Sequence, residues 1–275
     1  MTLATTRTRP AKLTIWRPFL VLVLREVTRL WKEKLGFSTR IATISLATVF
    51  VFDFIMPQLG NRGGGVASGY ATILAPGLVA VTTCNQALTA TLMSLVHDFG
   101  PLRRIDQTLM APLPIPLLAV VRIIGGTLHG VFAAGIVLPI VTFVHAPGAP
   151  PAIDLGRWPL LLCTVVVAGL LFSALGILVG TSVNPAKAAT LLPYGLPLMI
   201  MLGCVYYPWS ALNVIPWLQY AVLVNPVIYV TEATRATLAP QSEHLPELVL
   251  IWVLGAGALL AMALGTARFT ASTRR

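Results

Sequence analysis

Six apolar runs divide the chain, and each meets or nearly meets the length of about 20 residues that a helix needs to cross a bilayer. They cover residues 41–59, 71–96, 117–144, 159–181, 188–206 and 248–267. The composition agrees, since 56% of the residues are hydrophobic and only 10% are charged, whereas about a quarter of a soluble domain is charged. The sequence therefore predicts an all-α polytopic membrane protein with six transmembrane helices.

The basic residues predict the orientation of these helices. An even number of spans places both termini on the same side of the membrane. If that side is the cytoplasm, sixteen Lys and Arg residues lie inside and only Arg62, Arg157 and Arg235 lie outside. By the positive-inside rule, we expect both termini in the cytoplasm and the chain in the inner (plasma) membrane. No nucleic-acid partner is expected, because the basic residues do not gather on one soluble face.

The first forty residues are basic and end in an amphipathic pattern from Phe19 to Leu35. We expect a cytoplasmic tail followed by a helix that lies in the membrane interface. Charges follow its apolar stretch at once and no small-residue cleavage site succeeds it, which disfavours the alternative of a secretory signal peptide. The polar face of the expected interfacial helix carries Arg25, Glu26, Arg29 and Lys32. Residues 41–267 then form the transmembrane domain, and residues 268–275 form a cytoplasmic tail.

A polar island, His97 to Leu113, separates the second and third runs. Asp98 can cap a helix there, and the prolines that begin at Pro112 end it. We expect a short amphipathic helix at the cytoplasmic membrane surface, with a polar face that can bind a partner. Its apolar side carries Leu102, Ile105 and Leu109, and its polar side carries Arg103 and Arg104.

The segment between the fifth and sixth runs combines aromatic residues with prolines. Its apolar stretch from Trp217 to Tyr229 is too short to span and is interrupted within, so we expect re-entrant half-helices on the outer side. The residues that mark this segment are Pro208, Trp209, Pro216, Trp217, Asn225 and Pro226.

Four polar residues inside the runs are candidates for a transport pathway: Asp53, Asn85, Gln86 and His129. For Asp53, a pathway or subunit-interface role and simple snorkelling towards the outer face both remain open. The other three are interpreted first as interhelical hydrogen-bonding groups. Two glycine pairs, Gly126-xxx-Gly130 and Gly176-xxx-Gly180, allow close helix contact either within one chain or between two.

Motifs for metal or nucleotide chemistry are missing from the sequence. The cysteines and histidines show no ligand spacing, so we expect no metal site. A P-loop needs G-x-x-x-x-G-K-[ST], and the chain contains no Gly-Lys pair. If ATP drives this protein, another chain hydrolyses it, and this chain is expected to be no enzyme and to bind no cofactor.

Several short motifs resemble those of the ABC-2 type exporter permeases, and among these the drug-resistance and nodulation-factor export permeases. One is Leu74-Ala75-Pro76-Gly77 at the start of the second run, and another is Leu109-Met110-Ala111-Pro112-Leu113. The outer segment adds Tyr207-Pro208, Ile215-Pro216-Trp217, Asn225-Pro226-Val227-Ile228-Tyr229 and Glu232-Ala233-Thr234-Arg235.

The resemblance implies a pair of permease subunits, identical or paralogous, surrounded by membrane lipid, with two separate ATPase subunits that bind ATP and Mg²⁺. It also implies that the helix from Asp98 to Ala111 is the coupling helix that contacts the ATPase. The family usually has a Gly-Thr-Leu-Glu type sequence after its acidic residue, whereas this chain has Gly100-Pro101-Leu102-Arg103-Arg104. The reversed charge predicts an acidic cleft on the partner.

We therefore expect the membrane subunit of an ATP-driven exporter of an amphipathic drug, lipid or lipid-linked saccharide. The alternatives are a membrane-embedded enzyme that modifies lipids and a passive channel or scaffold.

Overall fold

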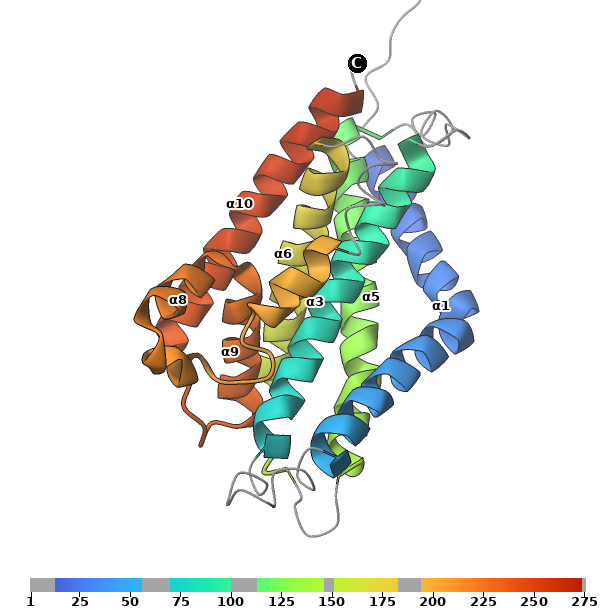
Figure 1. The fold of residues 1–275 in the computed structure, drawn as a ribbon. Helices are drawn as coiled ribbons and strands as arrows, with labels where there is room; N and C mark the ends of the chain where they lie inside the picture. The colour runs from blue at the N-terminus through green and yellow to red at the C-terminus, as the bar shows by residue number, and fades with distance from the viewer. Residues whose placement is uncertain (1–12, 56–69, 100–112, 146–150, 183–193, 274–275) are drawn as a thin grey trace, which may run out of the picture.

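Five long helices form the body of the molecule (Figure 1). The computed structural model describes residues 13–55, 70–99, 113–145, 151–182 and 194–273, and contains no strand within these ranges. The long helices are α1 (Leu13–Val49), which continues as the π-helix η1 (Phe50–Ile55), then α3 (Tyr70–Phe99), α5 (Ile115–Phe143), α6 (Trp158–Ser182) and α10 (Glu247–Thr273). Each contains a stretch that is long and apolar enough to cross a membrane. The prediction of an all-α polytopic membrane protein is confirmed at this level.

The predicted interfacial helix and the predicted first span form one continuous helix, α1 with η1. The linking residues 36–40 contain no proline, so nothing interrupts the backbone hydrogen bonds at the expected boundary. The helix instead changes direction part-way along its length (Figure 1). The predicted division at residue 40 is therefore not a break in secondary structure.

Helices α6 and α10 run parallel to each other. Arg157, just before α6, pairs with Glu247 at the start of α10 at 3.0 Å, and near their other ends Gly265 of α10 lies against Ala174 of α6. The chain must therefore return from one end of the bundle to the other between Ser182 and Glu247. We call the end where α3, α6 and α10 finish the C-terminal end of the bundle (Figure 1).

The predicted fifth span, residues 188–206, is not confirmed as a spanning helix. Residues 188–193 lie outside the described ranges, residues 194–201 are helical, and residues 202–207 form turns. Cys204 has a positive φ of 51°, a conformation that ends a helix. A Cβ at Gly203 would overlap the side chain of Val227, so the turn also depends on close packing against α9. The structure thus shows five candidate spans in its described part where the sequence predicts six.

The return segment also contains four short helices. They are η2 (Trp209–Val214), α8 (Pro216–Ala221), η3 (Val222–Val224) and α9 (Pro226–Leu238). Of these, α9 is the longest and packs against α3, α6 and α10. The predicted re-entrant course of this segment stays a prediction.

Helix α3 lies at the centre of the bundle, and glycines on α5 and α6 let its backbone come close. A Cβ at Gly130 of α5 would lie 3.0 Å from the carbonyl oxygen of Thr83 on α3. A Cβ at Gly176 of α6 would lie 2.9 Å from the carbonyl oxygen of Leu88 on α3. The other glycine of each predicted pair also faces α3. Both pairs therefore make contacts within one chain.

We expect Gly126→Ala to destabilise the bundle by about 1–3 kcal/mol, because the new methyl group would be overpacked against Thr91 and Ser173. The matched control is Gly135→Ala on the same helix, where no atom lies within 4 Å of the position that the new Cβ would take. This control should be neutral or slightly stabilising. Thermal unfolding of the purified chain in detergent measures both. Equal midpoints for the two variants would contradict the packing described.

Candidate functional site

Helix α9 carries the most deeply buried charges in the described part of the chain. Asn225 caps this helix, because its side-chain oxygen accepts a hydrogen bond from the backbone N–H of Val227 at 3.0 Å and Pro226 occupies the first turn. The amide of Asn225 also donates to the carbonyl of Met199 at 2.6 Å. The helix start is therefore fixed to the preceding helical segment.

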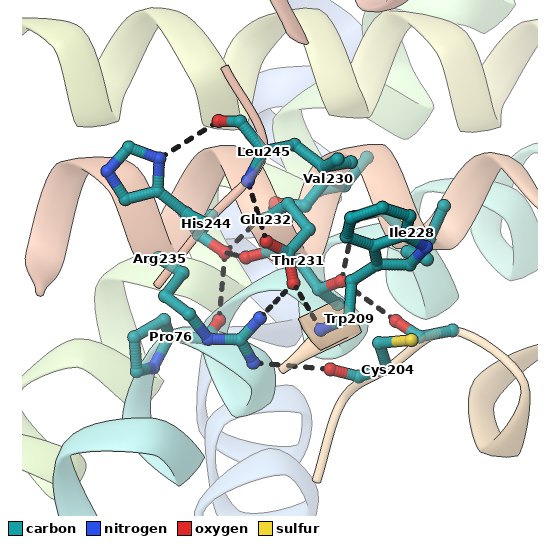
Figure 2. A network of polar contacts seen from close by, with 12 residues as sticks. Pro76, Cys204, Trp209, Ile228, Val230, Thr231, Glu232, Arg235, His244 and Leu245 are labelled. Carbon is teal, nitrogen blue, oxygen red and sulfur yellow. Dashed lines mark hydrogen bonds and ion pairs between the residues drawn. The ribbon is translucent and has the colours of Figure 1, made fainter. Parts of the chain in front are cut away.

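Glu232 and Arg235 form an ion pair on α9, with side chains that are 1% and 0% exposed. Figure 2 shows that this pair holds three other backbone segments. Glu232 accepts hydrogen bonds from the backbone N–H groups of Trp209 and Leu245, both at 3.1 Å. Arg235 donates to the carbonyl of Cys204 at 3.2 Å. The pair thus joins the turn after residues 194–201, the start of η2 and the segment before α10.

Two of the motifs that carry the family resemblance meet at this cluster. The hydroxyl of Thr234 donates to the carbonyl of Pro76 on α3 at 3.0 Å. A Cβ at Gly77 would overlap the carbonyl oxygen of Val205, so only glycine fits there. The Pro76-Gly77 step and the Glu232 to Arg235 motif therefore form one interface between α3 and the return segment.

A second ionic cluster lies near the C-terminal end of the bundle and joins three helices. Arg122 of α5 contacts Glu26 of α1 at 3.0 Å through Nη1 and Asp98 of α3 at 2.6 Å through Nη2. All three side chains are at most 10% exposed. We call these three residues the Arg122 cluster. One guanidinium thus links the end of α3, the first part of α5 and the predicted interfacial helix.

This cluster contains two residues of the predicted sites, Asp98 and Glu26. Asp98 lies in the last turn of α3 and pairs with Arg122, and the helix that it was predicted to cap lies outside the described residues. Glu26 is buried against Arg122, so it is not part of a polar face directed to solvent. Both residues pair with Arg122 because this arginine, enclosed in the bundle, needs carboxylates that only neighbouring helices supply.

The other polar residues of the predicted interfacial helix remain exposed. Arg25 and Lys32 are exposed, and Arg29 forms a surface pair with Glu33 at 3.5 Å. The coupling-helix residues Leu102, Arg103, Arg104, Ile105 and Leu109 lie outside the described residues.

Of the four pathway candidates, Gln86 and His129 line one pocket, and Asn85 and Asp53 do not line it. Asp53 is buried on η1. Gln86 accepts a hydrogen bond from Arg40 at 3.3 Å and so links α3 to α1. Asn85 accepts one from Thr89 of its own helix at 3.0 Å, and His129 contacts the carbonyl of Gly125, also on its own helix, at 2.9 Å. Of the predicted interhelical hydrogen bonds, only that of Gln86 is seen in the described part.

The outer-segment residues have local structural roles. Pro216 and Pro226 begin α8 and α9. The ring N–H of Trp209 donates to the carbonyl of Gln219 at 3.1 Å, while Trp217 is exposed. Pro208 precedes η2 as its capping residue.

The chain matches a known protein family over a segment that spans both clusters. A profile of the family described as ABC-2 type transporter matches residues 17–239, a range that includes Glu26, Asp98, Arg122, Glu232 and Arg235. The chain belongs to the ABC-2 type transporter family. The permease is also similar to two proteins called Inner membrane transport permease YadH, from Escherichia coli K12 and from Shigella flexneri. Each is 25% identical over 208 residues, which cover 75% of this permease and 76% of the relative.

The permease has no group of three His, Cys, Asp or Glu side chains that could hold a metal ion within its described residues. The ionic clusters were missed from the sequence for different reasons. Glu232 and Arg235 stand three residues apart in apolar surroundings, which is a detectable signal for a pair on one helix face. Arg122 stands alone in a long apolar run, and this indicates only that a carboxylate must lie nearby.

Proposed function

We propose that this permease is the membrane-spanning subunit of an ATP-driven exporter. Two permease copies, or this chain and a paralogue, would form a path for an amphipathic drug, lipid or lipid-linked saccharide. Separate ATPase subunits, which bind ATP and Mg²⁺, would dock on the cytoplasmic side at residues 98–111. Membership of the ABC-2 type transporter family supports the transport role.

The observation that carries the coupling role is the position of the Arg122 cluster. Asp98 precedes residues 99–111 and Arg122 follows them, and the two side chains pair at 2.6 Å. Arg122 also binds Glu26 of α1. A displacement of the segment between Asp98 and Arg122 would therefore act on α1, α3 and α5 together, which is the arrangement that a motor-driven change of helix tilt requires.

The orientation in this proposal rests on the distribution of basic residues. Residues 98–111 and both termini would lie in the cytoplasm, together with fourteen of the nineteen Lys and Arg residues when Arg40 and Arg122, which lie within the bundle, are not counted. The excess of Arg over acidic residues at positions 100–105 fits a partner with an acidic cleft.

We expect the double variant Leu102→Asp with Ile105→Asp to lose its ATPase subunit during purification from its native host. Two carboxylates on the apolar side of the predicted coupling helix would remove the contact of this helix with the ATPase or with the membrane surface. The retained ATPase subunit, identified by mass spectrometry, should fall about tenfold or more relative to wild type. The control is Val214→Asp with Ile215→Asp, at two exposed apolar positions of the return segment, which should retain the subunit. Undiminished binding by the first double variant would overturn the coupling assignment.

A further inference from the structure

A pocket of about 190 Å³ opens between α1, α3 and α5. We call it the α1 pocket. Its polar and aromatic wall is formed mainly by Arg29, Phe37, Arg40, Gln86, Arg122 and His129. Three helices thus contribute polar groups to one space, which is unusual for the interior of an apolar bundle.

The α1 pocket extends deep into the bundle. Gln86 lies thirteen residues before the end of α3 at Phe99, which is about 20 Å along the helix axis. His129 lies fourteen residues after the start of α5 at Ile115, which is about 21 Å. Both positions are close to the middle of their helices. The pocket therefore reaches from the level of Arg122 towards the centre of the membrane-spanning bundle.

The charges at the pocket are unevenly paired. Its wall contains three arginines and two glutamates. Glu26 pairs with Arg122, which also binds Asp98, and Glu33 pairs with Arg29. Arg40 donates to the neutral amide of Gln86 at 3.3 Å and lies 5.9 Å from the ring of Phe37. Among the described residues, Arg40 is the pocket arginine that no carboxylate pairs.

An exposed guanidinium near the middle of a membrane bundle needs an anionic partner or access to water. Phosphate is suited to this role, because the planar guanidinium can donate two parallel hydrogen bonds to its oxygens. Further along the chain, Ile44 of α1 and Phe50 of η1 are 61% and 56% exposed, and these apolar side chains can lie against alkyl chains. Arg40 is thus a cation within the membrane-spanning bundle, and an apolar surface lies beside it.

We propose that the α1 pocket binds the phosphate group of an anionic lipid-like amphiphile, with Arg40 as its main ligand and Gln86 beside it. The identification of this ligand as the transported molecule rests on the proposed export function. Lipid binding itself is a property of the permease chain and can be measured without the ATPase. Failure of the binding test would therefore leave the ATPase-docking test unaffected, and the reverse also holds.

The test uses the full-length permease purified in mild detergent and native mass spectrometry with phosphatidylglycerol and phosphatidylcholine. Wild type should retain phosphatidylglycerol about tenfold over phosphatidylcholine, the preference expected for a charge-assisted contact. Arg40→Gln should abolish this preference. The matched control is Arg25→Gln, at an exposed arginine of the same helix that does not line the pocket, and it should keep the preference. An equal preference in Arg40→Gln and wild type would overturn the proposal.

Two further measurements keep the proposal falsifiable if Arg40→Gln does not fold. Millimolar inorganic phosphate should not displace the lipid, because the alkyl chains contribute to binding; full displacement would show a site for free anions and overturn the lipid assignment. A photoactivatable phosphatidylglycerol should crosslink wild type on peptides that contain Arg40 or Gln86. Crosslinks confined to other helices would also overturn it.

Discussion

Replacing Arg235 by methionine is expected to lower the free energy of unfolding by about 3–5 kcal/mol. The change leaves Glu232 buried without its cation, although the carboxylate still accepts hydrogen bonds from Trp209 and Leu245. It also removes the hydrogen bond to the carbonyl of Cys204. Thermal or denaturant unfolding in detergent measures the loss.

Two further variants separate this effect from the loss of any arginine. Arg157→Met breaks the exposed pair with Glu247, whose side chains are 44% and 47% exposed, and should cost less than about 1 kcal/mol. Glu232→Gln combined with Arg235→Met removes both charges and should recover part of the stability, because the amide oxygen still accepts a backbone hydrogen bond. If Arg157→Met lowered the free energy of unfolding as much as Arg235→Met, burial would not be what makes the Glu232–Arg235 pair costly to break.

A comparable loss, about 3–5 kcal/mol, is expected for Arg122→Met. This change leaves two buried carboxylates, those of Glu26 and Asp98, with no cation between them. Because Arg122 is the ionic link from α5 to α1, we also expect α1 to loosen locally. Hydrogen–deuterium exchange should therefore increase in the peptides around Glu26 more than in those of α6.

The side-chain shape at position 122 provides a finer test. Arg122→Lys keeps the charge, but a single ammonium replaces two guanidinium nitrogens that reach two separate carboxylates. It should therefore give an intermediate loss. Arg29→Met, which breaks an exposed pair on α1, should change exchange and stability little. If Arg122→Lys and Arg122→Met behaved alike, charge would not be what holds the cluster.

The fold class followed from the sequence because long apolar runs are a local property. Five of the six predicted runs lie on the long helices of the structure. The continuity of the predicted interfacial helix with the first span was not predictable from the sequence. When only hydropathy is considered, the charges near Arg40 indicate the end of a membrane span. In the structure Arg29, Glu33 and Arg40 line a polar pocket between helices instead. The end of the fifth run depends on Gly203 and Cys204 packing against α9, which is a tertiary effect.

The site was predictable only in part. The motifs around Pro76 and Thr234 carried the family resemblance, but their contact joins residues 158 positions apart. Likewise, Arg122 pairs with Glu26, which lies 96 residues earlier in the chain. No sequence period predicts such pairings, because they are set by how the helices pack against α3. By contrast, the Glu232 and Arg235 pair is local to one helix turn.

Helix α3 is held near both ends, at Asp98 by the Arg122 cluster and at Pro76 by Thr234. Its 30 residues make a rod about 45 Å long. Proline lacks the N–H that would bond the carbonyl four residues earlier, so the rod is weakest near Pro76. If this point acts as a pivot, a sideways shift of about 3 Å at Asp98 would rotate the rod by about 5°. A small displacement of α3 at one membrane surface would then tilt the part of the helix that crosses the bilayer.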